Sequence, residues 1–297
     1  MPWTEHPRVM RLRRRSRVVD LALDVADGFR RHITGRNAAV LAYYGVLTLF
    51  PLLMVATTVL GFVLENRPDL QADILDSALA QIPVIGQRIE DNAGRIDGNY
   101  VALAIGLAFA TWSSLKAFVG AQIAFDDIWE VPVDRRANLF VQRGKALVGI
   151  GVIGAAQVGN VVLASVVGYA GLPRLGQAAI TVGGLVSNVA VLAAMYRLLT
   201  SQPTTWRAVL PGAAMGGVVY TALQYAGTLI VTRSFESASS VYGDFAALLA
   251  LMSWISIHAL VALVGAELNA AVTRRTAGGA SGLGVGPVQP MPSNAGG

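Results

Sequence analysis

The sequence lacks cysteine, is poor in charge, and has only three histidines, which are far apart in the chain. Without cysteine it can form no disulfide, thiolate zinc site or iron–sulfur cluster. Charged residues make up 14% of the 297 residues, whereas an average soluble domain has about 25%. No cluster of histidines suits a metal, so neither a metal site nor a cofactor is expected. Hydrophobic residues make up 54%, which excludes an ordinary soluble domain and indicates a polytopic membrane protein.

Six apolar stretches are each long enough to cross a bilayer, which takes about 20 residues. Together they form a membrane domain over residues 38–270. The stretches are 38–64, 100–125, 146–170, 177–200, 208–232 and 245–266. The predicted fold class is therefore all-α, with six transmembrane helices.

The two ends of the chain differ from the membrane domain. Residues 1–37 hold nine arginines, and between Val18 and Ile33 apolar residues recur at helical spacing. This pattern predicts an amphipathic helix that lies on the membrane surface and contacts anionic lipids. Residues 271–297 end in an uncharged run rich in glycine and proline. Such a run cannot bury a core, so these residues are predicted to form a disordered tail.

The distribution of lysine and arginine predicts the orientation of the chain. With the N-terminus inside, the inner segments hold 17 of the 23 basic residues and the outer segments hold five. Both termini are therefore expected in the cytoplasm. The outer loop, residues 65–99, is acidic and contains the amphipathic sequence PDLQADILDSALAQI. We expect a short helix there, which is either functional or a packed cap.

Several motifs resemble a known family. They are LAYY (41–44) and LTLFPLL (47–53) in the first span, DIWEV (127–131) with Arg135 and Arg136 after the second, Tyr196-Arg197, Trp206 and PGA (211–213) around the fourth and fifth, and YG (242–243), Trp254 and GAELNA (265–270) in the last. Over about residues 18–275 the chain is similar to the YihY/virulence factor BrkB family of bacterial inner-membrane proteins.

The resemblance implies six transmembrane helices in a bacterial inner (plasma) membrane, but no defined reaction. Family members are linked to virulence and envelope integrity, and some carry a transporter or a ribonuclease label. The chain departs from the family pattern at Asp126 and Asp127, where asparagine is common, and at Lys116.

Seven residues are candidates for transport or gating: Tyr43, Tyr44, Pro51, Lys116, Arg197, Glu267 and Asn269. The two tyrosines either line a cavity or belong to the aromatic belt at the membrane interface. Pro51 removes a backbone donor in mid-span, which either opens space for a ligand or only bends the helix.

The charged candidates also have two interpretations each. Lys116 is either a functional charge within the second span or, if that span ends near Gly120, a side chain that reaches back to the cytoplasmic surface. Glu267 either pairs with Arg197 or Arg135, which would lock the inner ends of the helices together, or acts as a gate or proton site.

Small and amide residues within the spans favour helix packing. Two series with small-xxx-small spacing predict a tight bundle or a homo-oligomer. They are Gly151, Ala155 and Gly159 in the third span, and Gly212 and Gly216 in the fifth. Polar side chains in the spans act either as hydrogen bonds between helices or as a polar path. They are Gln157, Asn160, Asn188, Gln224 and His258.

The sequence favours a membrane role without enzymatic chemistry. It has no Walker A loop and no metal-ligand cluster for a nuclease, and the basic N-terminus is explained by the membrane, so no nucleic-acid partner is expected. The leading hypothesis is a transporter or translocator of an amphiphilic or lipid-like solute in envelope maintenance, because the spans carry few charges. The alternative is a non-transporting envelope scaffold that binds partner proteins.

Overall fold

The computed structural model describes residues 13, 16–63, 100–170, 173–242 and 245–281. In this part of the chain the structure is α-helical, with a short 3-10 turn and no strand, which confirms the predicted all-α class. The elements are α2 (Arg17–Arg31), α3 (Thr34–Val63), α6 (Tyr100–Ile128), η2 (Val133–Arg135), α7 (Leu139–Ala170), α8 (Pro173–Leu199), α9 (Trp206–Tyr242) and α10 (Phe245–Ser281).

Four of the described helices are long and apolar enough to cross a membrane. These spans are Leu103–Ile128, Leu139–Asn160, Ala178–Leu199 and Leu248–Thr276. Helices α3 and α9, with 30 and 37 residues, coincide with the other two predicted spans, and the number of six stays a prediction. The short helix expected within 65–99 lies outside the described residues.

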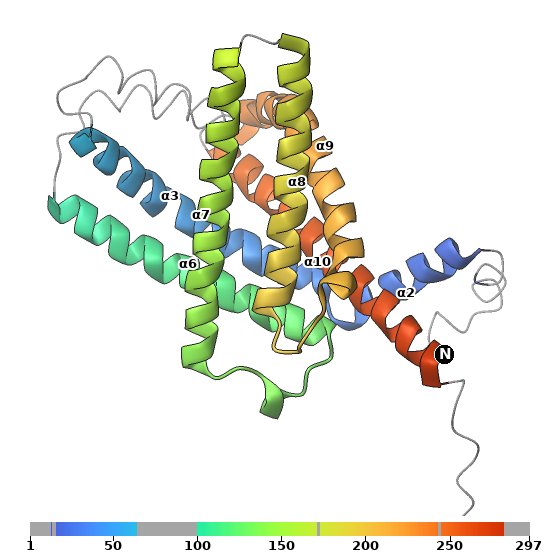
Figure 1. The fold of residues 1–297 in the computed structure, drawn as a ribbon. Coiled ribbons are helices and arrows are strands. Elements are labelled where there is room, and N and C mark those ends of the chain that lie inside the picture. Colours follow the sequence, from blue (N-terminus) through green and yellow to red (C-terminus); the bar gives the residue numbers. More distant parts are fainter. Residues whose placement is uncertain (1–12, 14–15, 64–99, 171–172, 243–244, 282–297) are drawn as a thin grey trace, which may run out of the picture.

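The helices converge at one end of the molecule, which we call the basal end. The first turns of α3, α7 and α9 and the last turns of α6 and α8 lie there (Figure 1). Toward the opposite end α3 and α6, which pack side by side, incline away from the antiparallel pair α7 and α8. Helix α10 packs against α9, α3, α2 and α6, so it occupies the centre of the bundle.

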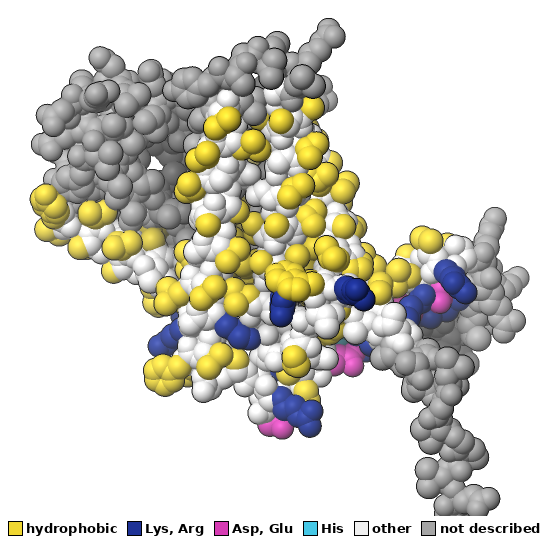
Figure 2. Space-filling model, in the orientation of Figure 1, with side chains coloured by type: hydrophobic (Ala, Val, Ile, Leu, Met, Phe, Trp, Pro, Cys, Tyr) yellow, Lys and Arg dark blue, Asp and Glu magenta, His cyan; other side chains and the backbone are white. Residues whose placement is uncertain are grey.

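The distribution of side chains fits this arrangement in a bilayer. Hydrophobic side chains cover the outer faces of α7 and α8, whereas lysines and arginines gather at the basal end (Figure 2). An apolar surface of this extent is stable only against lipid or another apolar partner. The buried core lies toward the basal end, where it includes Phe125, Ile128, Tyr196, Leu199 and Leu263.

A sharp elbow joins α2 to α3. Helix α2 begins at Ser16, whose hydroxyl accepts a hydrogen bond from the Val18 amide, and it ends at His32. Ile33 follows with a φ of 51°, a left-handed conformation that is strained for a β-branched residue. The Asn37 side chain donates to the His32 carbonyl at 3.2 Å, which helps to hold the elbow.

Helix α10 extends to Ser281, so the predicted disordered tail is wrong for residues 271–281. Ion pairs hold these last turns. Arg275 lies 2.7 Å from Asp20 and also pairs with Asp24, both on α2, and Arg274 lies 3.9 Å from Glu130. Composition alone could not reveal these partners from distant segments. Residues 282–297 lie outside the described part of the chain.

Candidate functional site

Glu267 is a buried carboxylate on α10 near the basal end, and its side chain is 0% exposed. Its Oε1 atom accepts a hydrogen bond from Thr34 Oγ1 at 2.9 Å and lies 2.8 Å from His32 Nδ1. Its partners therefore come from the α2–α3 elbow and are not Arg197 or Arg135, as the sequence had suggested. The pairing was missed because His32 and Glu267 are 235 residues apart in the chain.

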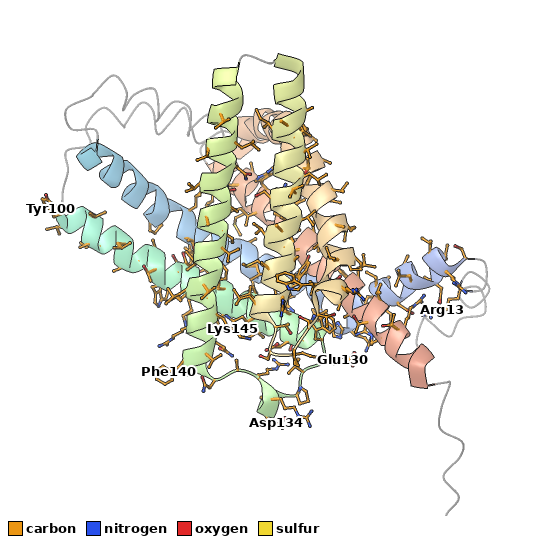
Figure 3. The ribbon with its side chains drawn as sticks, viewed as in Figure 1. Arg13, Tyr100, Glu130, Asp134, Phe140 and Lys145 are labelled. Carbon is orange, nitrogen blue, oxygen red and sulfur yellow. The ribbon has the colours of Figure 1, made fainter. Side chains whose placement is uncertain are left out.

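The other edge of the His32 ring faces Glu130, at the basal end after α6 (Figure 3). His32 Nε2 lies 3.5 Å from Glu130 Oε1, and Arg31 donates to the same oxygen at 2.9 Å. Partial burial raises the pKa of Glu130, but the hydrogen bond and charge of Arg31, with the charges of Arg274 and His32, outweigh it and lower the pKa below its ordinary value. Two carboxylates thus flank one imidazole, on a line from the surface to the core.

The GAELNA motif (265–270) on α10, which contains Glu267, also contacts α9. Asn269, which is fully buried, accepts a hydrogen bond on Oδ1 from the Gly212 amide at 2.7 Å. Gly212 follows Pro211, which removes a backbone donor from this turn of α9. The two helices approach so closely here that a Cβ atom on Gly212 would overlap the carbonyl oxygen of Gly265. Gly212, Gly265 and Asn269 therefore form one backbone contact between α9 and α10.

A second buried carboxylate, Asp126 on α6, holds the end of α8. Its Oδ1 atom accepts from the Ser201 amide at 2.6 Å, and its Oδ2 atom accepts from the Ser201 hydroxyl at 2.7 Å. The Thr200 hydroxyl lies 3.4 Å from Oδ1. The neighbouring Asp127 instead pairs with Arg136 at 2.8 Å, where both side chains are partly exposed. The sequence offered no sign of this difference between adjacent aspartates.

Replacing Asp126 with alanine is expected to lower the free energy of unfolding by about 3 kcal/mol, because the amide and the hydroxyl of the partly buried Ser201 lose their hydrogen bonds to a buried carboxylate. The matched Asp127→Ala variant is expected to lose less than about 1 kcal/mol, because its ion pair is partly exposed. Thermal unfolding of the two purified variants in detergent measures the difference. Similar losses in both would contradict the role given to Asp126.

The structure places Lys116 and Pro51 apart from these clusters. Lys116 lies on the exposed side of α6. Helix α6 and its apolar span both continue without a break past Gly120 to Ile128. The alternative of a second span that ends near Gly120 is therefore wrong, and the following residues pack into the core, as Ile128 does with 0% exposure. Pro51 lies within α3, which continues to Val63.

Of the remaining transport candidates, Tyr43 and Arg197 lie at exposed positions, and Tyr44 is half-buried. Tyr43 is 52% exposed and packs edge-on against Tyr44, with 5.3 Å between ring centroids. Arg197 is exposed and lies over the ring of Trp206, 4.5 Å from its centroid. An exposed aromatic ring under a guanidinium suits the interface between membrane and water.

The two small-residue series differ in their surroundings. A Cβ atom on Gly216 would press on the side chain of Leu192 at 2.7 Å, so the fifth-span series packs tightly. A Cβ atom on Gly151 or Gly159 would have no neighbour within 4 Å, and Ala155 is exposed. The third-span series thus makes no close contact with the described part of the chain, and its use in a homo-oligomer stays a prediction.

The polar residues of the spans act within and between helices. Asn188 on α8 donates to Thr221 at 3.2 Å and to Gln224 at 3.5 Å, both on α9. Within α7 the Asn160 side chain donates to Gln157 at 3.3 Å. His258 Nδ1 lies 2.9 Å from a carbonyl of its own helix, that of Trp254. The Asn188 contacts join α8 to α9, as expected for hydrogen bonds between membrane helices.

An apolar cavity of about 260 Å³ lies between the helices toward the basal end. Ile153, which lines it from α7, is 39% exposed, so the cavity reaches the surface beside α7. The hydroxyl of Tyr220 donates to the His258 carbonyl at 2.6 Å, so the apolar ring of Tyr220 forms part of the cavity wall. Each long helix contributes to the lining: Leu41 (α3), Phe118 (α6), Ile153 (α7), Leu192 (α8), Tyr220 (α9) and Leu263 (α10).

The described residues contain no group of three or more His, Asp or Glu side chains placed to hold a metal ion. The walls of the cavity suit a hydrocarbon chain, because a polar group there would lose its hydrogen bonds to water. Buried acidic side chains also lie at this end of the described bundle, namely Glu267, which is paired with His32, and Asp126.

A family model described as Virulence factor BrkB matches residues 25–284. Similar curated proteins are named UPF0761 membrane protein. One from Alkalilimnicola ehrlichii is 29% identical over 86% of this chain and 58% of its own length. Relatives from Laribacter hongkongensis (27% identical, 80% and 57% covered) and Pseudoalteromonas atlantica (24%, 78% and 79%) also match. The chain thus spans a little more than half of the first two relatives. No solved structure matches it.

Proposed function

We propose, from the premise that the chain belongs to the Virulence factor BrkB family of membrane proteins, that it translocates an amphiphilic, lipid-like solute. The observation that carries this proposal is the apolar cavity. Its volume of about 260 Å³ is close to the lower end of small-molecule sites, which is about 300 Å³. Because residues from six helices line it, a change in their packing would change access to it.

An amphiphile also needs polar partners beside its apolar site. Cationic side chains at the basal end supply them: Arg197 lies over Trp206, and Lys145 on α7 donates to the Thr200 carbonyl at 2.8 Å (Figure 3). An acyl chain would occupy the cavity while an anionic headgroup stays near these cations. The described residues that line the cavity are almost all apolar, so a strongly ionic solute fits less well than an amphiphile.

We place the basal end at the cytoplasmic face of a bacterial inner membrane, with both termini in the cytoplasm. The excess of basic residues in the segments at this end supports the orientation. Phe140, 85% exposed and directed outward from the first turn of α7 (Figure 3), and the exposed Trp206 suit an interfacial position. The arginine-rich N-terminal segment would then contact anionic lipids.

A scaffold that binds partner proteins is the second candidate function. The exposed series Gly151, Ala155 and Gly159 on α7 favours it, because small residues allow another helix to approach closely. The partner would be an envelope protein or a second copy of the chain. A scaffold does not need the cavity, so the experiments on the cavity separate the two functions.

Photo-crosslinking tests occupancy of the cavity. A photoreactive amino acid placed at Phe118, in the cavity wall, is expected to form a covalent adduct with phospholipid in proteoliposomes. The same residue at Ile128, which is fully buried outside the cavity lining, is expected to form none. Phe109, 47% exposed on α6, is the positive control. Lipid adducts at 109 but not at 118, by mass spectrometry, would contradict an occupied cavity.

A further inference from the structure

His32 and Glu267 form a buried imidazole–carboxylate pair that the proposed function does not use. The side chain of His32 is 8% exposed and that of Glu267 is 0% exposed. One atom of each group, His32 Nε2 and Glu267 Oε2, is buried without a hydrogen-bond partner among the residues that the structure describes. Leaving such atoms unpaired costs free energy, so this titratable pair is expected to have a role beyond joining two helices.

The ring of His32 can pass a proton from one side to the other. When both ring nitrogens are protonated, Nδ1–H donates to Glu267 Oε1 and Nε2–H faces Glu130. Transfer of the Nδ1 proton to Oε1 gives a neutral carboxyl and a neutral imidazole that keeps its Nε2 proton. Loss of the Nε2 proton instead leaves the Glu267 carboxylate charged. Proton uptake at the surface can thus neutralise the buried carboxylate.

Charged groups from three parts of the chain face this pair. On α2, Arg31 pairs with Asp27 at 3.1 Å and with Glu130 at 2.9 Å. Glu130 itself follows α6, and Arg274 of α10 lies 3.9 Å from it. Helix α3 contributes the uncharged hydroxyl described above. Glu130 therefore holds a negative charge beside the outer nitrogen of His32, where it stabilises the imidazolium.

The α2–α3 elbow packs directly against Glu267, so a change in the charge of Glu267 would affect it. Gly28 in the last turn of α2 is buried, and a Cβ atom there would overlap Glu267 Oε2. The elbow residue Ile33 has a left-handed backbone, which is held only by its surroundings. A neutral Glu267 loses the charge-assisted part of its hydrogen bonds to the elbow, so protonation would loosen α2 and α3 from α10.

We infer that His32 and Glu267 form a proton-binding site within the helix bundle, which exchanges protons with water beside Glu130 and controls how the α2–α3 elbow is held against α10. The ligand is the proton, and the site requires no solute. The inference therefore goes beyond the proposed function and stands or falls separately from it.

Histidine NMR of the full chain in lipid nanodiscs tests this site. Isotope-labelled histidine gives signals that report ring protonation, and a His32→Gln variant assigns those of His32. We expect the His32 signals to change with pH as the ring takes up a proton. In Glu130→Gln this change should lie at lower pH than in wild type, because a negative charge 3.5 Å from Nε2 is removed.

The controls separate a proton site from a structural contact. Glu130 is half exposed, so Glu130→Gln is expected to fold even if a Glu267→Gln variant does not. The His258 signals should keep their midpoint in Glu130→Gln, because His258 contacts Trp254 and Tyr220, not the elbow. A His32 ring that does not titrate, or a midpoint that is the same in wild type and Glu130→Gln, would overturn the inference.

Discussion

Replacing Gly212 with alanine is expected to destabilise the protein by about 3 kcal/mol, the upper end of the usual cost of overpacking. The added Cβ atom would overlap the carbonyl oxygen of Gly265. Because that oxygen belongs to the backbone, the only relief is to separate α9 from α10, which would also break the hydrogen bond from Gly212 to Asn269. A lower midpoint of thermal unfolding in detergent would show the effect.

Gly151→Ala is the matched control for this prediction. It makes the same chemical change in a long apolar helix, but at a position where the new Cβ has no atom within 4 Å from the rest of the described chain beyond its own helical turn. Alanine also has the higher helix propensity, by about 1 kcal/mol, so the stability should stay equal or rise slightly. Equal destabilisation by the two variants would mean that the contact between α9 and α10 does not hold the bundle together.

Replacing Ala121 with tryptophan is expected to reduce lipid translocation at least about tenfold, if the cavity is the path. Ala121 lies in the cavity wall on α6, and an indole ring at this position would fill much of the space. A tenfold fall corresponds to about 1.4 kcal/mol added to the barrier. The measurement is the initial rate of translocation of fluorescent phospholipid in proteoliposomes, normalised to folded protein.

Ala155→Trp is the control for size and hydrophobicity. Ala155 is exposed on α7 and is not part of the cavity wall, so the same substitution there is expected to leave the rate within about twofold of wild type. If Ala121→Trp retained the wild-type rate, the solute would have to cross elsewhere. If only Ala155→Trp reduced the rate, the small-residue face of α7 would become the better site.

The helical class and the positions of the spans follow from apolar runs, which periodicity and length reveal directly. The motif around Glu267 and Asn269 was also identified from the sequence, and the structure places both residues in the basal core. The sequence does not reveal the direction in which each of these two side chains points. Glu267 faces the α2–α3 elbow, whereas Asn269 faces α9, although they are two residues apart.

Contacts between distant segments account for the rest. His32 looked like an isolated histidine in a basic segment, and only folding brings it to a carboxylate 235 residues away. The last turns of α10 resembled the start of a disordered tail, but Arg275 finds Asp20 and Asp24 on α2. Similarly, the sequence singles out Asp126 only as a departure from the family pattern, and its burial depends on the packing of the last turns of α6, which continue to Ile128.

The most direct test of the central claim is translocation of fluorescent phospholipid by the purified wild-type protein in liposomes. A membrane-impermeant reductant added outside bleaches only the lipid that reaches the outer leaflet. We predict bleaching well beyond the half that an inactive vesicle shows. Bleaching that stops at half, in vesicles with folded protein, would contradict unaided lipid translocation and favour the scaffold.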